Sequence, residues 1–152
     1  MSQARSIQLI LNHMIRSLKE VLPVKVDISG PTITPEPFIQ KELSVLIGMV
    51  GDTKGRLIID TTLDAMRTIG YEMFKMEVSD EMIESLSGEV GNMLAGNLSV
   101  GLERDAFLID ITTPTVMTGT SKIHGFGKAI TLPVTLNDQH TMKVLVMLDE
   151  DA

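Results

Sequence analysis

Residues 79–104 read SDEMIESLSGEVGNMLAGNLSVGLER, and this stretch decides the fold. Its apolar residues recur at steps of three and four, which collects them on one face of a helix with 3.6 residues per turn. These residues are Met82, Ile83, Leu86, Val90, Met93 and Val100. Ser79 or Asp80 can cap the first turn, because a side-chain oxygen there can accept from a free backbone N–H. The stretch predicts one long amphipathic helix.

Four glycines lie in this helix, at positions 88, 91, 96 and 101, and each costs about 1 kcal/mol relative to alanine. Close packing against another element would explain most of them. A second explanation depends on the face that they occupy. At about 100° per residue, a strip beside the apolar face holds mostly small side chains. This strip contains Ser85, Gly88, Glu89, Asn92, Gly96 and Ser99. Glu89 and Asn92 would then project together where a partner can approach.

The composition limits the class of protein. A chain of 152 residues with 43% hydrophobic content suits a single domain with a sizeable core. The net charge of −7 and the scarcity of aromatic residues count against nucleic-acid binding. The chain has no cysteine, no apolar run of the roughly 18 residues that a membrane helix needs, and no leader pattern. We therefore expect a cytoplasmic protein with no membrane partner and no disulfide or thiolate metal site.

The remaining pattern predicts an α+β fold. Residues 4–21 and 64–75 have helical periodicity, and a loop punctuated by prolines follows the first sheet segment. Six segments are expected to be strands, at 24–29, 43–50, 56–61, 107–117, 128–136 and 141–148. The order is helix–strand–strand–strand, a linking helix, and helix–strand–strand–strand again. We expect a mostly antiparallel sheet of about six strands, with the two long helices on a shared face.

The symmetry extends to individual residues. Residues 26–33, VDISGPTI, align with residues 109–116, IDITTPTV. We interpret this as an internal duplication within a single domain, 1–152, with halves at about 1–61 and 79–152 linked by helix 64–75. Chance similarity between two strands is the alternative. With a gap of about one turn, Asn12 falls opposite Asn92 and Leu9 opposite Glu89, so only the second half has a carboxylate three residues before its asparagine.

Common catalytic arrangements are missing from the sequence. His13, His124 and His140 are not spaced as metal ligands, and we expect them to be surface or turn residues. A thiol nucleophile is excluded without cysteine. The glycine-containing stretch 125–128 leads into a predicted strand instead of a helix, so it does not fit a phosphate-binding loop. The most promising chemistry left is the pair Glu89 and Asn92.

The arrangement Ser85-x-x-x-Glu89-x-x-Asn92, followed by Pro114, resembles the signature of the CheC/CheX/FliY phosphatases of bacterial chemotaxis. One intact motif in a chain of this size is most like the CheX members of that family. The resemblance implies a CheC-like fold, a phosphorylated CheY-type response regulator as partner, and hydrolysis of its aspartyl phosphate. It also implies a homodimer with no cofactor of its own, because the Mg²⁺ would be bound by the partner.

The resemblance also implies a role for each motif residue. Asn92 would hold a water in line with the P–O bond, and Glu89 would pair with the partner's lysine. Ser85 and Pro114 would support the site, and Gly88 and Gly96 would leave room for the partner. Because an acyl phosphate is already labile, positioning a water can suffice for catalysis. Two alternatives remain: a non-catalytic module that binds a response regulator or the flagellar switch, and a dimerisation domain that buries its glycine-rich helix.

Overall fold

The structure is a computed structural model, and it describes residues 2–149. Its α-helices are α1 (Gln3–Val21), α2 (Leu63–Phe74) and α3 (Ile83–Arg104), and a short 3₁₀ turn, η1 (Asp80–Met82), precedes α3. The helices predicted at 4–21 and 64–75 are confirmed to within one residue at each end. None of the helices in the described residues is long and apolar enough to cross a membrane.

The predicted cap of the long helix is wrong. Ser79 precedes η1, but its side chain makes no capping hydrogen bond, and neither does that of Met82 before α3. The Asp80 carboxylate accepts hydrogen bonds from the Arg67 guanidinium instead. The 3₁₀ turn shifts the start of the α-helix to Ile83, so Asp80 lies beside α2 and not over the first free N–H groups of α3.

The strands are more numerous than predicted. The described residues form β1 (Val26–Ile28), β2 (Thr32–Pro35), β3 (Phe38–Gln40), β4 (Leu43–Gly51), β5 (Gly55–Thr61), β6 (Ile109–Ile111), β7 (Thr115–Thr118), β8 (Ser121–Ile123), β9 (Lys128–Leu136) and β10 (His140–Leu148). The long strands match their predictions closely. The strand predicted at 107–117 is broken at 112–114 into β6 and β7, and the predicted proline loop contains β2 and β3.

The main sheet has eight strands, with the central order β1-β9-β10-β5-β4-β6. All of its pairs are antiparallel, and the β5–β10 pair at its centre joins the two halves of the chain. At one edge β1 and β2 follow each other along β9, and at the other edge β6 and β7 follow each other along β4. Each half of the chain therefore places its two short strands along a long strand of the other half. The duplication itself stays a prediction from the sequence.

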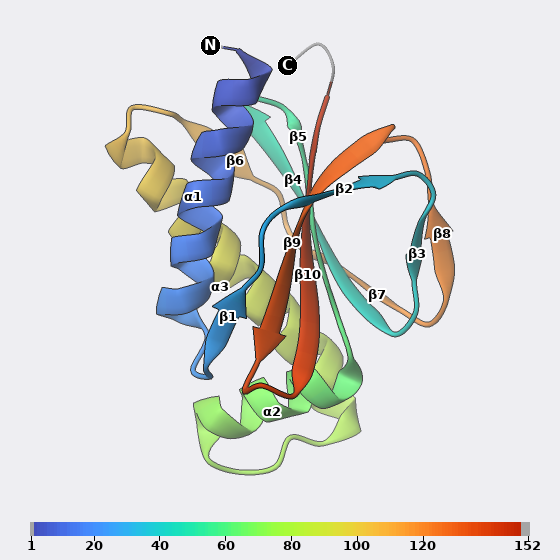
Figure 1. The fold of residues 1–152 in the computed structure, drawn as a ribbon. Helices are drawn as coiled ribbons and strands as arrows, with labels where there is room; N and C mark the ends of the chain where they lie inside the picture. The colour runs from blue at the N-terminus through green and yellow to red at the C-terminus, as the bar shows by residue number, and fades with distance from the viewer. Residues whose placement is uncertain (1, 150–152) are drawn as a thin grey trace.

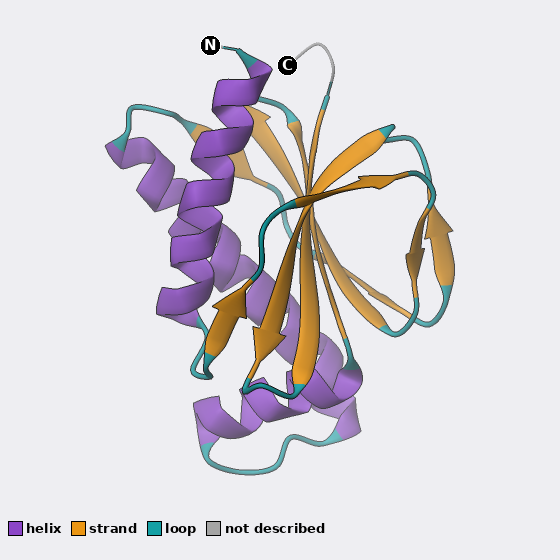
Figure 2. Ribbon diagram, in the orientation of Figure 1, coloured by secondary structure: helices purple, strands orange, loops and turns teal. Residues whose placement is uncertain are grey.

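Helices and strands form distinct layers. Figures 1 and 2 show α1 and α3 lying together on one face of the main sheet, as predicted. The two helices are joined by the buried Ser17 hydroxyl, which donates to the Leu94 carbonyl at 2.8 Å. On the opposite face, the separate β3–β8 ribbon covers a small apolar cluster. Its members are Phe38, Ile58, Ala129, Leu145 and Met147.

The buried face of α3 differs from the predicted one. Leu86 and Val90 lie in the core as expected, but Met82, Met93 and Val100 are 51%, 37% and 52% exposed. The core instead takes Leu94, Leu98 and Leu102, which continue the four-residue steps from Val90. The predicted set followed the seven-residue step from 86 to 93 to 100, which turns around a straight helix by about 20° per step. The four-residue step turns by about 40° in the opposite sense, so Met93 and Val100 fall on the other side of Leu86 from the buried line. The helix thus has two apolar stripes, one buried and one open.

Candidate functional site

The motif side chains lie on the outer face of α3. Ser85, Glu89 and Asn92 are exposed, whereas Leu86 and Val90, in the same two turns, are buried against the core. Residues three or four apart on a helix are neighbours on its surface. The Glu89 carboxylate and the Asn92 amide can therefore act together on one group outside the protein.

The four glycines of α3 divide into two kinds. A Cβ at Gly91 would lie 2.7 Å from Val45 Cγ1, and a Cβ at Gly101 would collide with the Arg16 guanidinium. Close packing explains these two. A Cβ at Gly88 would make only an ordinary contact at 3.5 Å, and a Cβ at Gly96 would have no neighbour within 4 Å. Packing therefore accounts for two of the four glycines and not for most of them, and the other two lie on the motif's open side.

An open groove runs between α3 and the connection from β6 to β7, with a volume of about 610 Å³. The helix contributes one wall and the connection the other. The lining residues are Glu84, Ser85, Gly88, Glu89, Asn92, Ile111, Thr112, Thr113, Pro114 and Val116. Five of the six predicted site residues thus meet in one groove, and Gly96 lies outside it on the next turn of α3.

The far wall is held firmly against the sheet. Thr112 Oγ1 accepts from the Gly48 N–H at 2.8 Å, and the Thr112 N–H donates to the Gly48 carbonyl at 3.0 Å. The helix is fixed to the same wall, because the Ser99 hydroxyl donates to the Ile109 carbonyl at 3.0 Å. Hydrogen bonds therefore tie the connection to β4 and the helix to β6. Such a site can hold a visiting group in one orientation.

Sequence reasoning missed the rest of the groove. Thr112 and Thr113 lie just before Pro114 in the aligned segment 109–116, which predicted a strand and not a groove wall. Glu84, in the first turn of α3, was not among the predicted site residues. It gives the groove a second carboxylate beside Glu89, and both ionisable side chains of the lining are acidic. The groove therefore favours a ligand or partner protein that carries cationic groups.

The proposed equivalence between the two long helices does not hold at the carboxylate position. Leu9 is only 8% exposed and lies in the core, whereas Glu89 is exposed. Asn12 is exposed, as Asn92 is. A residue that faces the core cannot correspond to one that faces solvent. The gap placed in the helix alignment is therefore wrong, although α1 has no glutamate at an equivalent outward position near Asn12.

The histidines are only partly as predicted. His124 is exposed, and the half-buried His140 makes a 3.1 Å hydrogen bond with the Thr68 hydroxyl. His13 is not a free surface residue, because its Nε2 lies 2.6 Å from the Asp105 carboxylate where α1 meets the end of α3. Among residues 2–149, no group of three or more His, Cys, Asp or Glu side chains is placed to hold a metal ion.

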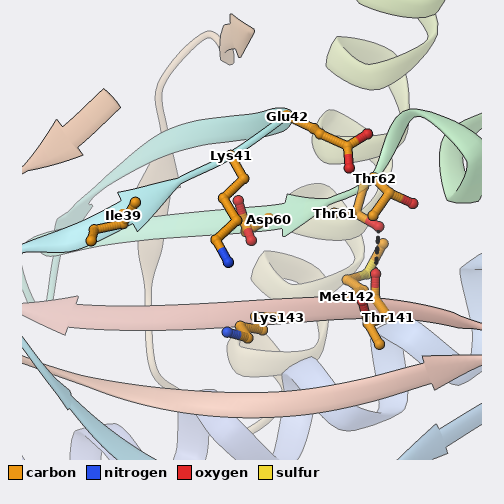
Figure 3. A pocket seen from close by; sticks show the side chains of 9 residues that line it. All are labelled: Ile39, Lys41, Glu42, Asp60, Thr61, Thr62, Thr141, Met142 and Lys143. Atoms are coloured by element: carbon orange, nitrogen blue, oxygen red, sulfur yellow. Dashed lines mark hydrogen bonds between the residues drawn. The ribbon is translucent and has the colours of Figure 1, made fainter. Parts of the chain in front are cut away.

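A second, smaller cleft of about 190 Å³ lies on the other face of the sheet (Figure 3). Its central acid is Asp60, which alternates with the core residue Ile59 along β5 and so points away from the helices. Burial raises the pKa of Asp60, although the Ser44 hydroxyl donates to it at 2.8 Å. Lys41 and Lys143 line the same cleft. Its mixed charges and small volume favour the α3 groove as the functional site.

Known proteins resemble this chain in both sequence and fold. The family described as chemotaxis phosphatase CheX matches residues 43–135, which is more than half of the chain. The CheY-P phosphatase CheX of Thermotoga maritima is 31% identical over 137 residues, which is 88% of this chain and 88% of that protein.

Solved structures agree with these matches. CheX from Borrelia burgdorferi, in a complex described as CheX–CheY–BeF₃–Mg²⁺, is 25% identical with a TM-score of 0.76, over 95% of this chain and 97% of that one. A CheC-like protein from Shewanella sp. PV-4 is 26% identical with a TM-score of 0.77, over 94% and 96% of the two chains. The predicted CheC-like α+β fold and the predicted enzyme class are confirmed. The chain belongs to the CheX family of chemotaxis phosphatases.

Proposed function

We propose that this protein hydrolyses the aspartyl phosphate of a CheY-type response regulator, and that the reaction takes place at the α3 groove. The observation that carries the proposal is the exposed Asn92 amide, one turn from Glu89, at an open groove with a rigid far wall. The Thermotoga relative is named a CheY-P phosphatase, and the Borrelia relative has been solved with CheY. Both names support this choice of substrate.

The reaction requires little from the enzyme beyond positioning. Water attacks the phosphorus, the aspartate carboxylate leaves, and inorganic phosphate is the second product. Asn92 holds the water in line, because its amide offers both a donor and an acceptor without a charge that would repel the phosphoryl oxygens. A hundredfold acceleration requires about 2.7 kcal/mol of barrier reduction, which orientation alone can supply.

The other groove residues set the approach of the partner. Glu89 pairs with a cation of the response regulator and so fixes the register in which Asn92 meets the phosphoryl group. Ser85 lines the helix wall of the groove and Pro114 lines the opposite wall, and Gly88 and Gly96 keep the helix surface low. The protein supplies no cofactor of its own in this proposal, since the Mg²⁺ belongs to the partner.

Assembly and location belong to the same proposal. Among residues 2–149, β2 pairs only with β9, and its free outer edge supports a homodimer, because Ile33 is 64% exposed there and a second copy could add a strand. Sedimentation of the wild type and of Ile33→Lys tests this, because a charge at the edge should weaken such a dimer. A cytoplasmic location remains the expectation from the sequence.

The test is Asn92→Ala, with Asn12→Ala as the matched control on the exposed side of α1. Purified protein is mixed with a CheY-type receiver charged by acetyl phosphate, and inorganic phosphate is followed against spontaneous decay. Asn92→Ala should reduce the accelerated rate by at least about tenfold and leave receiver binding nearly intact, because the amide acts on water. Asn12→Ala should behave as wild type.

The same measurements separate the alternatives. A non-catalytic module would bind the charged receiver and leave its decay unchanged even in the wild type. A dimerisation domain with a buried α3 would show no receiver binding. Full activity of Asn92→Ala would overturn the proposed mechanism.

A further inference from the structure

The open stripe of α3 has a feature that the catalytic motif does not explain. Met93, Gly96 and Val100 lie at steps of three and four on one line of the helix surface, and we refer to them as the α3 seam. Met93 is 37% exposed and Val100 is 52% exposed. Gly96 lies between them, and a Cβ at this position would have nothing within 4 Å. The seam is therefore two apolar side chains separated by a bare stretch of helix backbone at Gly96, which we call the notch.

This arrangement is unusual for a helix face that only meets water. Single exposed apolar residues are common on protein surfaces. A glycine within a helix is different, because it lowers helix stability and here fills no packing need. Two apolar side chains flanking such a glycine form a surface into which a side chain of another molecule fits. Methionine suits this purpose, since its flexible thioether adapts to an incoming surface.

The seam is continuous with the catalytic groove. Met93 directly follows Asn92, and Glu89 lies one turn before Met93 on the same side of the helix. A stable protein contact covers about 800 Å² on each partner, which corresponds to a disc with a radius of roughly 16 Å. Val100 lies eight residues after Asn92, or about 12 Å along the helix. A contact of this size centred on Asn92 therefore reaches Val100 and covers the rest of the seam.

We infer that the α3 seam is the apolar part of the docking surface for the phosphorylated receiver, and that it sets the affinity for that partner without taking part in the chemical step. The inference rests on the proposed function. The receiver would insert an apolar side chain into the notch at Gly96, beside the cation that pairs with Glu89. A second copy of this chain is a poor occupant, because on the seam it would cover Asn92 and close the groove.

The experiment uses the double variant Met93→Gln/Val100→Asn, which keeps side-chain size and helix propensity close to those of the wild type. Ile39→Asn is the matched control, because Ile39 is 49% exposed on β3, far from the helix layer (Figure 1). Initial rates of phosphate release at increasing receiver concentration give kcat and KM. Binding to a receiver activated with beryllofluoride and Mg²⁺ gives Kd without turnover.

We expect the double variant to raise both KM and Kd by about tenfold or more and to leave kcat within about twofold of the wild type. Ile39→Asn should match the wild type in all three quantities. Unchanged KM and Kd in the double variant would overturn the inference while the proposed function stands. A change of oligomeric state in sedimentation would overturn it as well, since the seam would then be an interface between copies. If the wild type binds the activated receiver without accelerating its decay, the proposed function fails and Kd alone still tests the seam.

Discussion

Two glycines five residues apart on α3 should respond to the same substitution with opposite signs. Gly91 faces the sheet, where a Cβ would lie 2.7 Å from Val45 Cγ1 and 3.4 Å from Val45 Cβ. Val45 is 1% exposed, and its branched side chain has little freedom to move. Gly96 faces open space with nothing within 4 Å of a Cβ. The pair therefore separates the cost of crowding from the intrinsic preference of a helix for alanine.

The magnitudes follow from these two environments. Alanine is favoured over glycine inside a helix by about 1 kcal/mol, and this is the whole effect expected for Gly96→Ala. Overpacking a buried contact costs about 1 to 3 kcal/mol, so Gly91→Ala should lose about 1 kcal/mol after the same helix preference is subtracted. The two variants should differ by about 2 kcal/mol. For a chain of this length that difference corresponds to melting temperatures about 4 to 8 °C apart.

Thermal and urea unfolding of the wild type and both variants measures the free energy of unfolding directly. Gly96→Ala should be the most stable of the three and Gly91→Ala the least. Gly96→Ala should also raise KM for the charged receiver several-fold, because its methyl group enters the notch of the α3 seam. The reasoning is refuted if Gly91→Ala is more stable than the wild type, or if Gly96→Ala is less stable.

Three further substitutions test charges. The Glu36 carboxylate accepts hydrogen bonds from the Gly125 and Gly127 N–H groups, and these bonds hold its pKa below the usual 4.5. The ionised carboxylate therefore stabilises the folded protein above pH 4.5, and this stabilisation is lost as the pH falls through the lowered pKa. Glu36→Gln should therefore flatten the acid limb of the stability curve. Burial raises the pKa of Asp60, so ionisation at neutral pH opposes folding, and Asp60→Asn should raise stability at pH 7 more than at pH 3. Glu89→Gln should raise KM for the receiver mainly at low ionic strength, where screening is weakest.

The sequence was sufficient to bring the candidate motif residues together because a helix fixes which residues share a face. Once residues 83–104 are helical, Ser85, Glu89 and Asn92 must lie near one another, whatever the sheet does. Pro114 required more, because its distance from the helix depends on β6 pairing with β4. Only the resemblance to the phosphatase signature singled out Pro114, and the threonines beside it were not recognised as the groove wall.

The local sequence pattern could not predict which stripe of α3 is buried, nor the strands β2 and β3. The two apolar stripes of α3 are similar in composition, and only the positions of α1 and the sheet decide that Leu94 and Leu98 are buried while Met93 and Val100 stay open. Strands β2 and β3 have four and three residues and lie among prolines. Their pairing partners, β9 and β8, follow much later in the chain, so no short window contains the signal.

The packing of α3 supports the catalytic role proposed for the exposed Asn92 amide. A side chain on a mobile surface would need to be ordered at every encounter, and this would offset the benefit of positioning a water. Asn92 avoids that cost, because its helix is buried along Leu86, Val90 and Leu94 and is tied to α1 by the Ser17 hydroxyl at the level of the motif. The close approach at Gly91 draws the same turn onto the sheet. The buried glycine thus fixes the backbone whose opposite side presents the amide, so a loss of helix packing at Gly91 should lower kcat even though no group in the groove is altered.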